Sequence, residues 1–286
     1  MARPHVEFIH APQLPWVESG LHGWAWRPLA CKTLSADPDN GGMTALLQFA
    51  PGFTDREFVL AADFELFVLD GGIEINSREY GLDGYAFLPA GYRYQSLTSR
   101  AGAVVLAFFN VGPARKPWAS ASASASASEP NGLIERIDTY AMPWTTADID
   151  PAVQFLRLSH KVLRYVPATG AKTILLATGA QTHPRDFREA QLQHDCVEEM
   201  YLLGGEITGE RGVMYEGAYF WRPPGKWHGP FGSRRGSLSL VRFVDGHHQN
   251  TWSQQALPFS FEPDYQPELP AELAALASQP WSPPRH

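Results

Sequence analysis

Three residues in the second half of the chain have side chains that bind metal ions: His194, Glu198 and His228. Glu198 comes four residues after His194, and His228 comes thirty residues later, beyond a Pro-Pro-Gly turn. Two neutral imidazoles and one carboxylate form the facial ligand set of non-haem iron, which manganese, nickel and zinc also accept. Short strands could bring these side chains to one point. We therefore predict a site for one divalent metal ion, with Fe(II) preferred over Zn, Mn or Ni.

The stretches that carry these residues resemble the two conserved motifs of the cupin superfamily. The second motif, G-x5-P-x-G-x2-H, is matched at every fixed position by Gly217, Pro223, Gly225 and His228. The latter part of the first motif is matched by His194, Glu198 and Gly205, but its leading histidine is Leu192 here. The resemblance implies a jelly-roll barrel, the double-stranded β-helix, with three protein ligands instead of the usual four.

The strands that would position these residues are indicated by short apolar runs between glycines and prolines. Residues 57–60, 65–69 and 238–244 are rich in Val, Leu and Phe and are bounded by turn residues. This pattern is typical of an all-β sandwich or barrel. The one stretch with helical periodicity, residues 270–277, predicts a short C-terminal helix.

An internal repeat indicates that the chain holds two such barrels in tandem. Leu14-Pro15-Trp16 recurs at residues 142–144, residues 65–71 align with 199–205, and 89–91 align with 223–225. The offset is 128 or 129 early in the repeat and 134 later. We predict a first cupin-like domain over residues 1–112, a linker over 113–132 that contains five Ala-Ser pairs, a metal-binding cupin domain over 133–262, and a tail over 263–286.

The first copy lacks the three metal ligands. At the offset of 134, its counterparts of His194, Glu198 and His228 are Leu60, Phe64 and Tyr94. Apolar side chains cannot coordinate a metal ion. We expect the first barrel to be metal-free, with a more fully packed interior.

Other residues near the motifs are weaker site candidates. His183 or Cys196 could supply a further ligand, although a surface histidine and a buried thiol are the simpler interpretations. Glu199 alternates with Glu198 along the predicted strand and should face the other way. The candidates for the substrate pocket are Met200, Leu202, Phe220, Trp227 and Arg242. Arg242 lies among apolar residues, so it either reaches solvent or binds an anion.

The composition excludes several classes of partner. A formal net charge of −7 without a basic cluster argues against nucleic-acid binding. No apolar stretch is long enough to cross a membrane, and no secretion signal is visible, so we expect a cytoplasmic protein. Cys31 and Cys196 lie too far apart in the sequence to form a disulfide framework. A small-molecule substrate and a homodimer are the expected partners, the dimer by analogy with other cupins.

The second motif looks most like that of diketone- and hydroxyacetophenone-cleaving dioxygenases and of the cupin half of zinc anti-sigma factors. The resemblance implies a mononuclear metal-dependent enzyme for a small oxygen-bearing substrate, with dioxygenase cleavage of a C–C bond as the leading reaction. Two alternatives stay open. One is a non-oxidative isomerase, cyclase, lyase or hydrolase, and the other is a non-enzymatic metal-binding sensor.

Overall fold

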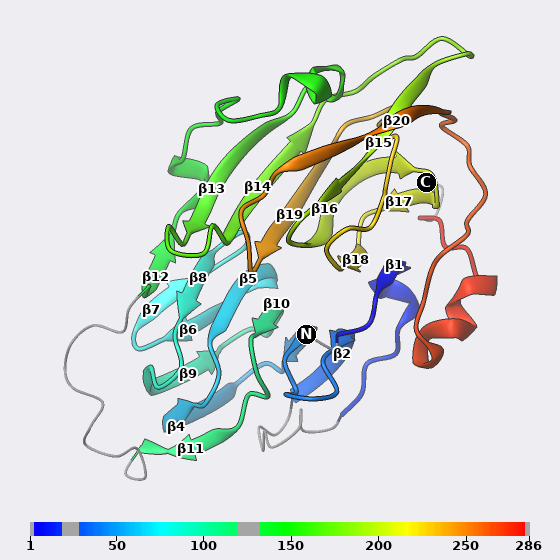
Figure 1. Cartoon of the computed structure of the whole chain (residues 1–286). Helices are drawn as coiled ribbons and strands as arrows, with labels where there is room; N and C mark the ends of the chain where they lie inside the picture. Colours follow the sequence, from blue (N-terminus) through cyan, green and yellow to red (C-terminus); the bar gives the residue numbers. More distant parts are fainter. Residues whose placement is uncertain (1–2, 19–28, 119–131, 284–286) are drawn as a thin grey trace. The chain divides into compact units, whose positions relative to one another are not determined.

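A computed structural model of the chain describes residues 3–18, 29–118 and 132–283, which fold mainly as antiparallel β-strands (Figure 1). They form two compact units. The first consists of Met1–Arg3 and Pro15–Ala141, and the second of Pro4–Leu14 and Met142–His286. The predicted all-β architecture with two cupin barrels is confirmed. No helix in the described ranges is both long and apolar enough to span a bilayer.

The first unit contains two sheets. The six-stranded sheet has the order β12-β8-β5-β10-β3-β2, and the five-stranded sheet has the order β11-β4-β9-β6-β7. Their bounds are β2 Leu29–Ala36, β3 Met43–Phe49, β4 Phe53–Leu60, β5 Phe64–Gly71, β6 Ile73–Ile75, β7 Arg78–Tyr80, β8 Tyr85–Leu88, β9 Arg93–Ser99, β10 Ala103–Phe109, β11 Arg115–Pro117 and β12 Ile134–Ile137. A continuous apolar core with residues from both sheets fills this unit.

The second unit repeats this plan with a larger sheet. Its main sheet runs β1-β18-β16-β19-β14-β13, with β17 paired to β16, and β15 pairs with β20 in a separate two-stranded sheet. The bounds are β1 Val6–His10, β13 Ser159–Tyr165, β14 Lys172–Thr178, β15 Arg188–His194, β16 Val197–Gly209, β17 Gly212–Tyr215, β18 Ala218–Arg222, β19 Ser237–Val244 and β20 Asn250–Pro258.

The helices of the described chain are short 3-10 helices. They are η1 Ala11–Gln13, η3 Thr139–Ala141, η4 Pro151–Leu156 and η5 Ala271–Ser278. The last of these corresponds to the short helix predicted over residues 270–277. Of the predicted tail, Tyr265 donates a hydrogen bond to the Phe8 carbonyl, so this segment packs against β1.

Strand pairing reproduces the sequence repeat residue by residue. Phe58 pairs with Tyr94 across β4 and β9, and Leu192 pairs with His228 in the second unit at the same offset of 134. Each unit also keeps one buried tyrosine–carboxylate hydrogen bond. Tyr85 donates to Glu65 and Tyr219 donates to Glu199, each over 2.7 Å.

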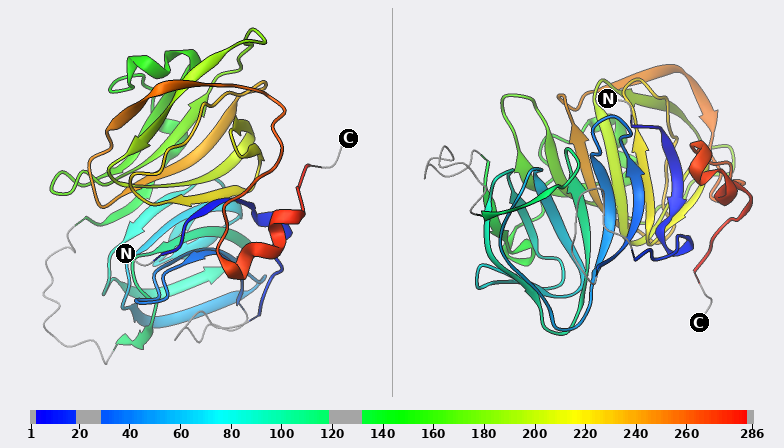
Figure 2. Two further views of the ribbon diagram at one scale, coloured as in Figure 1. Left: turned by 45° about the vertical axis from the view of Figure 1, so that its right-hand side comes forward. Right: turned by 90° about the horizontal axis from the view of Figure 1, so that it is seen from below.

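The observed units differ from the predicted domain boundaries because the two sequence repeats exchange their first strands, β1 and β12. Strand β1 precedes the first unit in sequence but pairs with β18 of the second (Figure 2, right). Strand β12 precedes the second unit but pairs with β8 of the first. Each strand covers a sheet edge that would otherwise expose unpaired backbone groups.

The expected linker also differs from the structure at its start. Residues 115–117, predicted as linker, form β11 and pair with β4. The Ala-Ser run at residues 119–128 lies outside the described residues.

Candidate metal centre

The three predicted ligands meet in the second unit. His194 is the last residue of β15, Glu198 is the second residue of β16, and His228 follows the turn after β18. Glu198 Oε2 lies 3.7 Å from His194 Nε2 and 3.6 Å from His228 Nε2. All three ligand atoms lie within 4.8 Å of one another. Ligands about 2.1 Å from one ion lie about 3.0–3.4 Å apart, so a small contraction would complete a coordination site.

Backbone hydrogen bonds orient both imidazoles for this role. The Nδ1 of His228 lies 2.8 Å from the Lys226 carbonyl, and that of His194 lies 3.3 Å from the Gln249 carbonyl. A carbonyl accepts only from an N–H, which leaves the Nε2 lone pair of each neutral ring for a ligand. Burial, with Arg222 and His194 nearby, lowers the pKa of His228 well below its usual range. Two imidazole nitrogens and one carboxylate thus converge on one point, which fits a bound cation.

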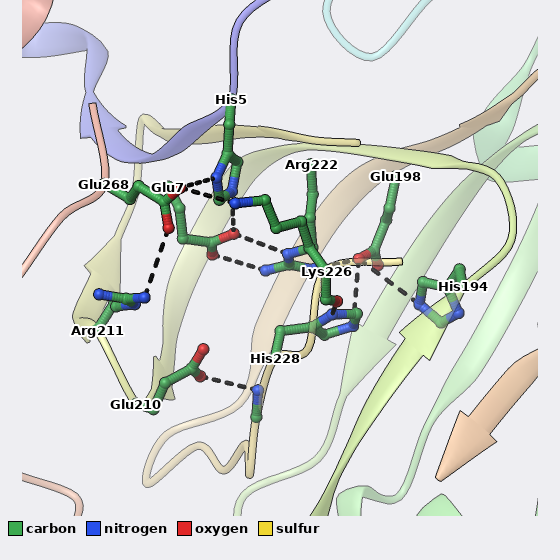
Figure 3. A network of polar contacts seen from close by, with 11 residues as sticks. His5, Glu7, His194, Glu198, Glu210, Arg211, Arg222, Lys226, His228 and Glu268 are labelled. Atoms are coloured by element: carbon green, nitrogen blue, oxygen red, sulfur yellow. Dashed lines mark hydrogen bonds and ion pairs between the residues drawn. The ribbon is translucent and has the colours of Figure 1, made fainter. Parts of the chain in front are cut away.

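A buried arginine holds the Glu198 carboxylate (Figure 3). Arg222 lies opposite Glu198 in the β16–β18 pair, and its Nη1 donates to Glu198 Oε2. The same guanidinium forms a bidentate pair with Glu7 of β1, at 2.7 and 2.6 Å. Burial disfavours the charged form of Arg222, but Glu7 and Glu198 outweigh this effect and raise its pKa. The N-terminal strand therefore supports a ligand whose position is almost 200 residues further along the sequence.

Further charged residues extend this network toward the surface (Figure 3). His5 lies 3.3 Å from Glu7 and 2.9 Å from Glu268. Lys226 also pairs with Glu268, at 2.8 Å. The hydrogen bond from Lys226 is the main cause that lowers the pKa of Glu268 to about 2. Because Glu268 belongs to the C-terminal segment, both ends of the described chain contribute to this network.

The ligand group opens into a cavity of about 140 Å³ within the second unit. Most of its wall is apolar. Met200 and Phe220, both predicted as pocket residues, line it, as does Leu192 at the position of the missing histidine. Leu202 is fully buried in the adjoining core cluster instead of the cavity wall. The site therefore combines a polar end with a largely apolar chamber of a size that suits a small organic molecule.

Two predicted pocket residues lie elsewhere. Arg242 forms an ion pair with Glu199, on the strand face opposite Glu198, because adjacent residues of a strand point to opposite sides. It is therefore not positioned as an anion anchor in this cavity. Trp227 is 44% exposed and does not line the cavity.

The two residues considered as further ligands also lie outside the ligand group. The ring of His183 stacks on Phe187 at 4.1 Å and on Phe261 at 5.5 Å, which fixes it in an aromatic cluster. Cys196 is buried in the apolar core cluster. Burial, together with the charge of Glu198, raises the pKa of its thiol to about 11. Neither side chain adds a fourth ligand in this conformation.

The cavity contains three basic residues that motif analysis did not single out: His160, Lys172 and His248. His248 lies in the loop after β19, and its ring centroid lies 4.5 Å from that of His194. Burial, with His194 and Lys172 nearby, lowers the pKa of His248 to about 2. Burial also lowers the pKa of Lys172. Comparison of the two repeats could have revealed two of them, because His160 and Lys172 stand where the first copy has the apolar residues Cys31 and Met43.

At the equivalent positions the first unit is packed, as the sequence predicted. Leu60, Phe64 and Tyr94 are each at most 1% exposed and belong to one core cluster. The rings of Phe58 and Tyr94 stack in parallel with centroids 4.4 Å apart. In the described part of the chain, the group of His194, Glu198 and His228 is the one assembly of potential metal ligands.

Comparison with solved structures supports the fold. A protein of Nostoc punctiforme proposed to be a dioxygenase aligns with a TM-score of 0.70 at 22% identity, over 91% of this chain and 92% of that one. An oxalate decarboxylase aligns with a TM-score of 0.53 at 10% identity, over 87% and 80% of the two chains. A variant of the Bacillus subtilis oxalate decarboxylase gives 0.51 at 11% identity, over 86% and 79%.

None of the curated proteins matches the sequence significantly. A family model does match, over residues 7–251, and is described as a domain of unknown function, DUF4437. The matched region extends from the strand that carries Glu7 to the first residues of β20, and it includes both units and all three candidate ligands. The chain therefore belongs to the DUF4437 family, and it has the fold of a two-barrel cupin.

Proposed function

We propose that the chain is a mononuclear metal-dependent bicupin enzyme that acts on a small oxygen-bearing organic molecule. His194, Glu198 and His228 would hold one divalent metal ion, with Fe(II) as the preferred ion. The observation that carries the proposal is the convergence of three acceptor atoms within 4.8 Å of one another at an apolar cavity. When bound, the metal would supply a Lewis acid and a template for substrate oxygens, and as ferrous iron it could activate dioxygen.

The protein's own residues would prepare this chemistry. The Lys226 and Gln249 carbonyls fix the tautomers of the two imidazoles. Arg222 holds the Glu198 carboxylate in place and so limits its rotamers. The apolar wall, which includes Met200 and Phe220, would exclude bulk water and strengthen electrostatic interactions with the substrate.

The leading reaction is dioxygenase cleavage of a C–C bond, supported by the resemblance of the second motif to diketone-cleaving enzymes. The fold similarity to oxalate decarboxylase keeps a non-oxidative lyase, isomerase, cyclase or hydrolase as the alternative. A homodimer in the cytoplasm stays a prediction.

Elemental analysis combined with oxygen uptake tests this proposal. Protein purified without oxygen would be analysed by plasma mass spectrometry and then mixed with β-diketones and hydroxylated aryl ketones. About one iron per chain with oxygen uptake supports the dioxygenase. One zinc or manganese per chain without uptake supports the non-oxidative class. Protein that binds no metal when supplied with these ions would contradict the proposal.

Variants assign the metal to its ligands. His228→Ala and Glu198→Ala should each lose bound metal while the far-UV circular dichroism stays that of the unchanged protein. Tyr94→Phe is the matched control, because Tyr94 stands at the His228 position of the first unit. It should keep the full metal content. Retention of metal by both ligand variants would exclude this site.

A further inference from the structure

The wall of the cavity has a second polar group besides the metal ligands. Lys172 of β14, His160 of β13 and His248 of the loop after β19 all line it. The Lys172 ammonium lies 3.5 Å from His248 Nδ1. Since the His248 ring in turn contacts the ring of His194, the lysine is separated from the ligand group by about the width of one imidazole.

Among the described residues, the Lys172 ammonium is hydrogen-bonded to no carboxylate. Its cation faces the ring of Phe243 at 5.0 Å, and the Cys196 thiol and Asp148 act on it only through longer-range attraction. The other carboxylates in the cavity wall are engaged elsewhere. Asp150 accepts from three donors, and Glu198 is held by Arg222.

This arrangement is costly for stability alone. A cation–π contact offsets only a small part of the cost of withdrawing an ammonium group from water. The first unit shows how the same framework is filled when no ligand has to enter. Its residues at the positions of Lys172 and His160 are Met43 and Cys31, both buried in the core cluster. A half-buried lysine that replaces a core methionine is explained by a ligand that carries negative charge.

We propose that Lys172, together with His248 beside it and His160 in the same cavity wall, is an anion-binding subsite, and that the natural substrate is a small organic acid. Its chelating oxygens would face His194, Glu198 and His228, and its carboxylate would bind the Lys172 ammonium. The proposal rests on the proposed function for the chelating half and adds the substrate class. Lys172 is then a specificity-determining residue.

The size of the cavity limits this acid. An engineered cavity of about 150 Å³ binds benzene, and the present cavity is about 140 Å³. The substrate should therefore have few non-hydrogen atoms. Its carboxylate should be only a few bonds from its chelating oxygens, because Lys172 and the ligand group share one small chamber.

A matched pair of probes tests the subsite: 2,4-dioxopentanoate, and pentane-2,4-dione, which has the same diketone without the carboxylate. Their dissociation constants would be measured by isothermal titration calorimetry, with the metal content of each sample determined in parallel. The unchanged protein should bind the acid at least about tenfold more tightly than the dione, as expected for one charge-assisted hydrogen bond.

Three variants isolate the charge. Lys172→Met installs the residue of the first unit and should remove the preference for the acid without loss of metal. Lys172→Arg should keep the preference, and Lys116→Met, an exposed lysine of the first unit, should leave it unchanged. Circular dichroism and thermal melts would establish that each variant folds.

The outcomes separate this inference from the proposed function. A preference for the acid that persists in Lys172→Met, or failure of the unchanged protein to bind the acid, would overturn the subsite whatever the metal content. Protein that takes up no metal when supplied with it, yet still prefers the acid through Lys172, would overturn the metal-enzyme proposal and keep the subsite.

Discussion

The main sheets of the two units share strand order and register, and each unit has a buried tyrosine–carboxylate pair, but the units differ in what fills the barrel. Five polar residues of the second barrel have apolar or aromatic counterparts that pack in one cluster of the first. In chain order, His160, Lys172, His194, Glu198 and His228 correspond to Cys31, Met43, Leu60, Phe64 and Tyr94. The same sheet framework therefore forms with or without the polar group, and the shared tyrosine–carboxylate pairs lie on the strand face away from it.

The two exchanged strands each contribute a glutamate to an ion pair, and the two ion pairs differ in burial. Glu7 of β1 and Glu135 of β12 occupy the same repeat position, at an offset of 128. Glu7 pairs with a guanidinium that is 2% exposed, whereas Glu135 pairs with Arg78, and both of those side chains are more than 40% exposed. The same strand exchange thus supports a buried site in one unit and only a surface contact in the other.

The largest expected effect comes from Glu7→Gln, which leaves a buried arginine with half its charge partners. We expect a loss of about 3 kcal/mol of unfolding free energy, as for other buried ion pairs with one member removed. Metal affinity should fall about tenfold, since Arg222 then acts on Glu198 alone. Glu135→Gln should cost less than about 1 kcal/mol. Urea unfolding measures both, and equal losses would contradict the contrast.

A second difference concerns acid sensitivity, because the described residues of the first unit include no histidine. In the second unit, burial lowers the pKa of His10 from 6.5 to about 4, and its Nε2 accepts a hydrogen bond from the backbone N–H of Tyr215. As the pH falls below 6.5, His10 becomes protonated in the unfolded chain but stays neutral in the folded chain, which favours unfolding. The contribution of neutral His10 to the free energy of unfolding is complete above pH 6.5 and is lost progressively down to about pH 4.

We expect this single group to cost about 2 kcal/mol between pH 7 and pH 5. His10→Gln keeps a hydrogen-bond acceptor that does not titrate. Between pH 7 and pH 5 the unfolding free energy of the unchanged protein should fall by about 2 kcal/mol more than that of His10→Gln, when both are measured without metal. A difference that stays constant from pH 7 to pH 5 would show that His10 is not held neutral.

A partial conversion of the first barrel tests whether one ligand is enough. Leu60→His places an imidazole at the position of His194, but Phe64 and Tyr94 cannot complete the set. Metal per chain should not rise above the value of the unchanged protein. Since Leu60 is 1% exposed, the buried polar ring should cost about 2 kcal/mol. Extra metal bound by Leu60→His would mean that the first unit has ligands that the repeat comparison overlooks.

Much of this arrangement could be predicted from the sequence, because the signals are local. The motif around Gly217 to His228 and the offset of the repeat located the barrels and the ligand group. Alternation along β16 correctly separated Glu198 from Glu199. The same rule applied to β19 would have excluded Arg242, which lies opposite Glu199 in the register.

The supporting contacts had no local signal. Glu7 and Arg222 are 215 residues apart, and their pairing depends on the exchange of first strands between the units. His248 lies in a loop, and strand alternation does not predict where a loop residue lies relative to the cavity. Lys172 could have been found, since a lysine aligned with a core methionine is visible in the repeat once every position is compared.

The smallest expected effect concerns the two cysteines, which are both buried and unpaired. Cys196 lies two residues before Glu198 yet packs in the core, outside the cavity wall. Cys196→Ala should therefore cost about 1 kcal/mol and leave the metal content unchanged, as should Cys31→Ala in the first unit. Plasma mass spectrometry and thermal melts compare the two. Loss of metal in Cys196→Ala alone would make the thiol a ligand of the metal centre.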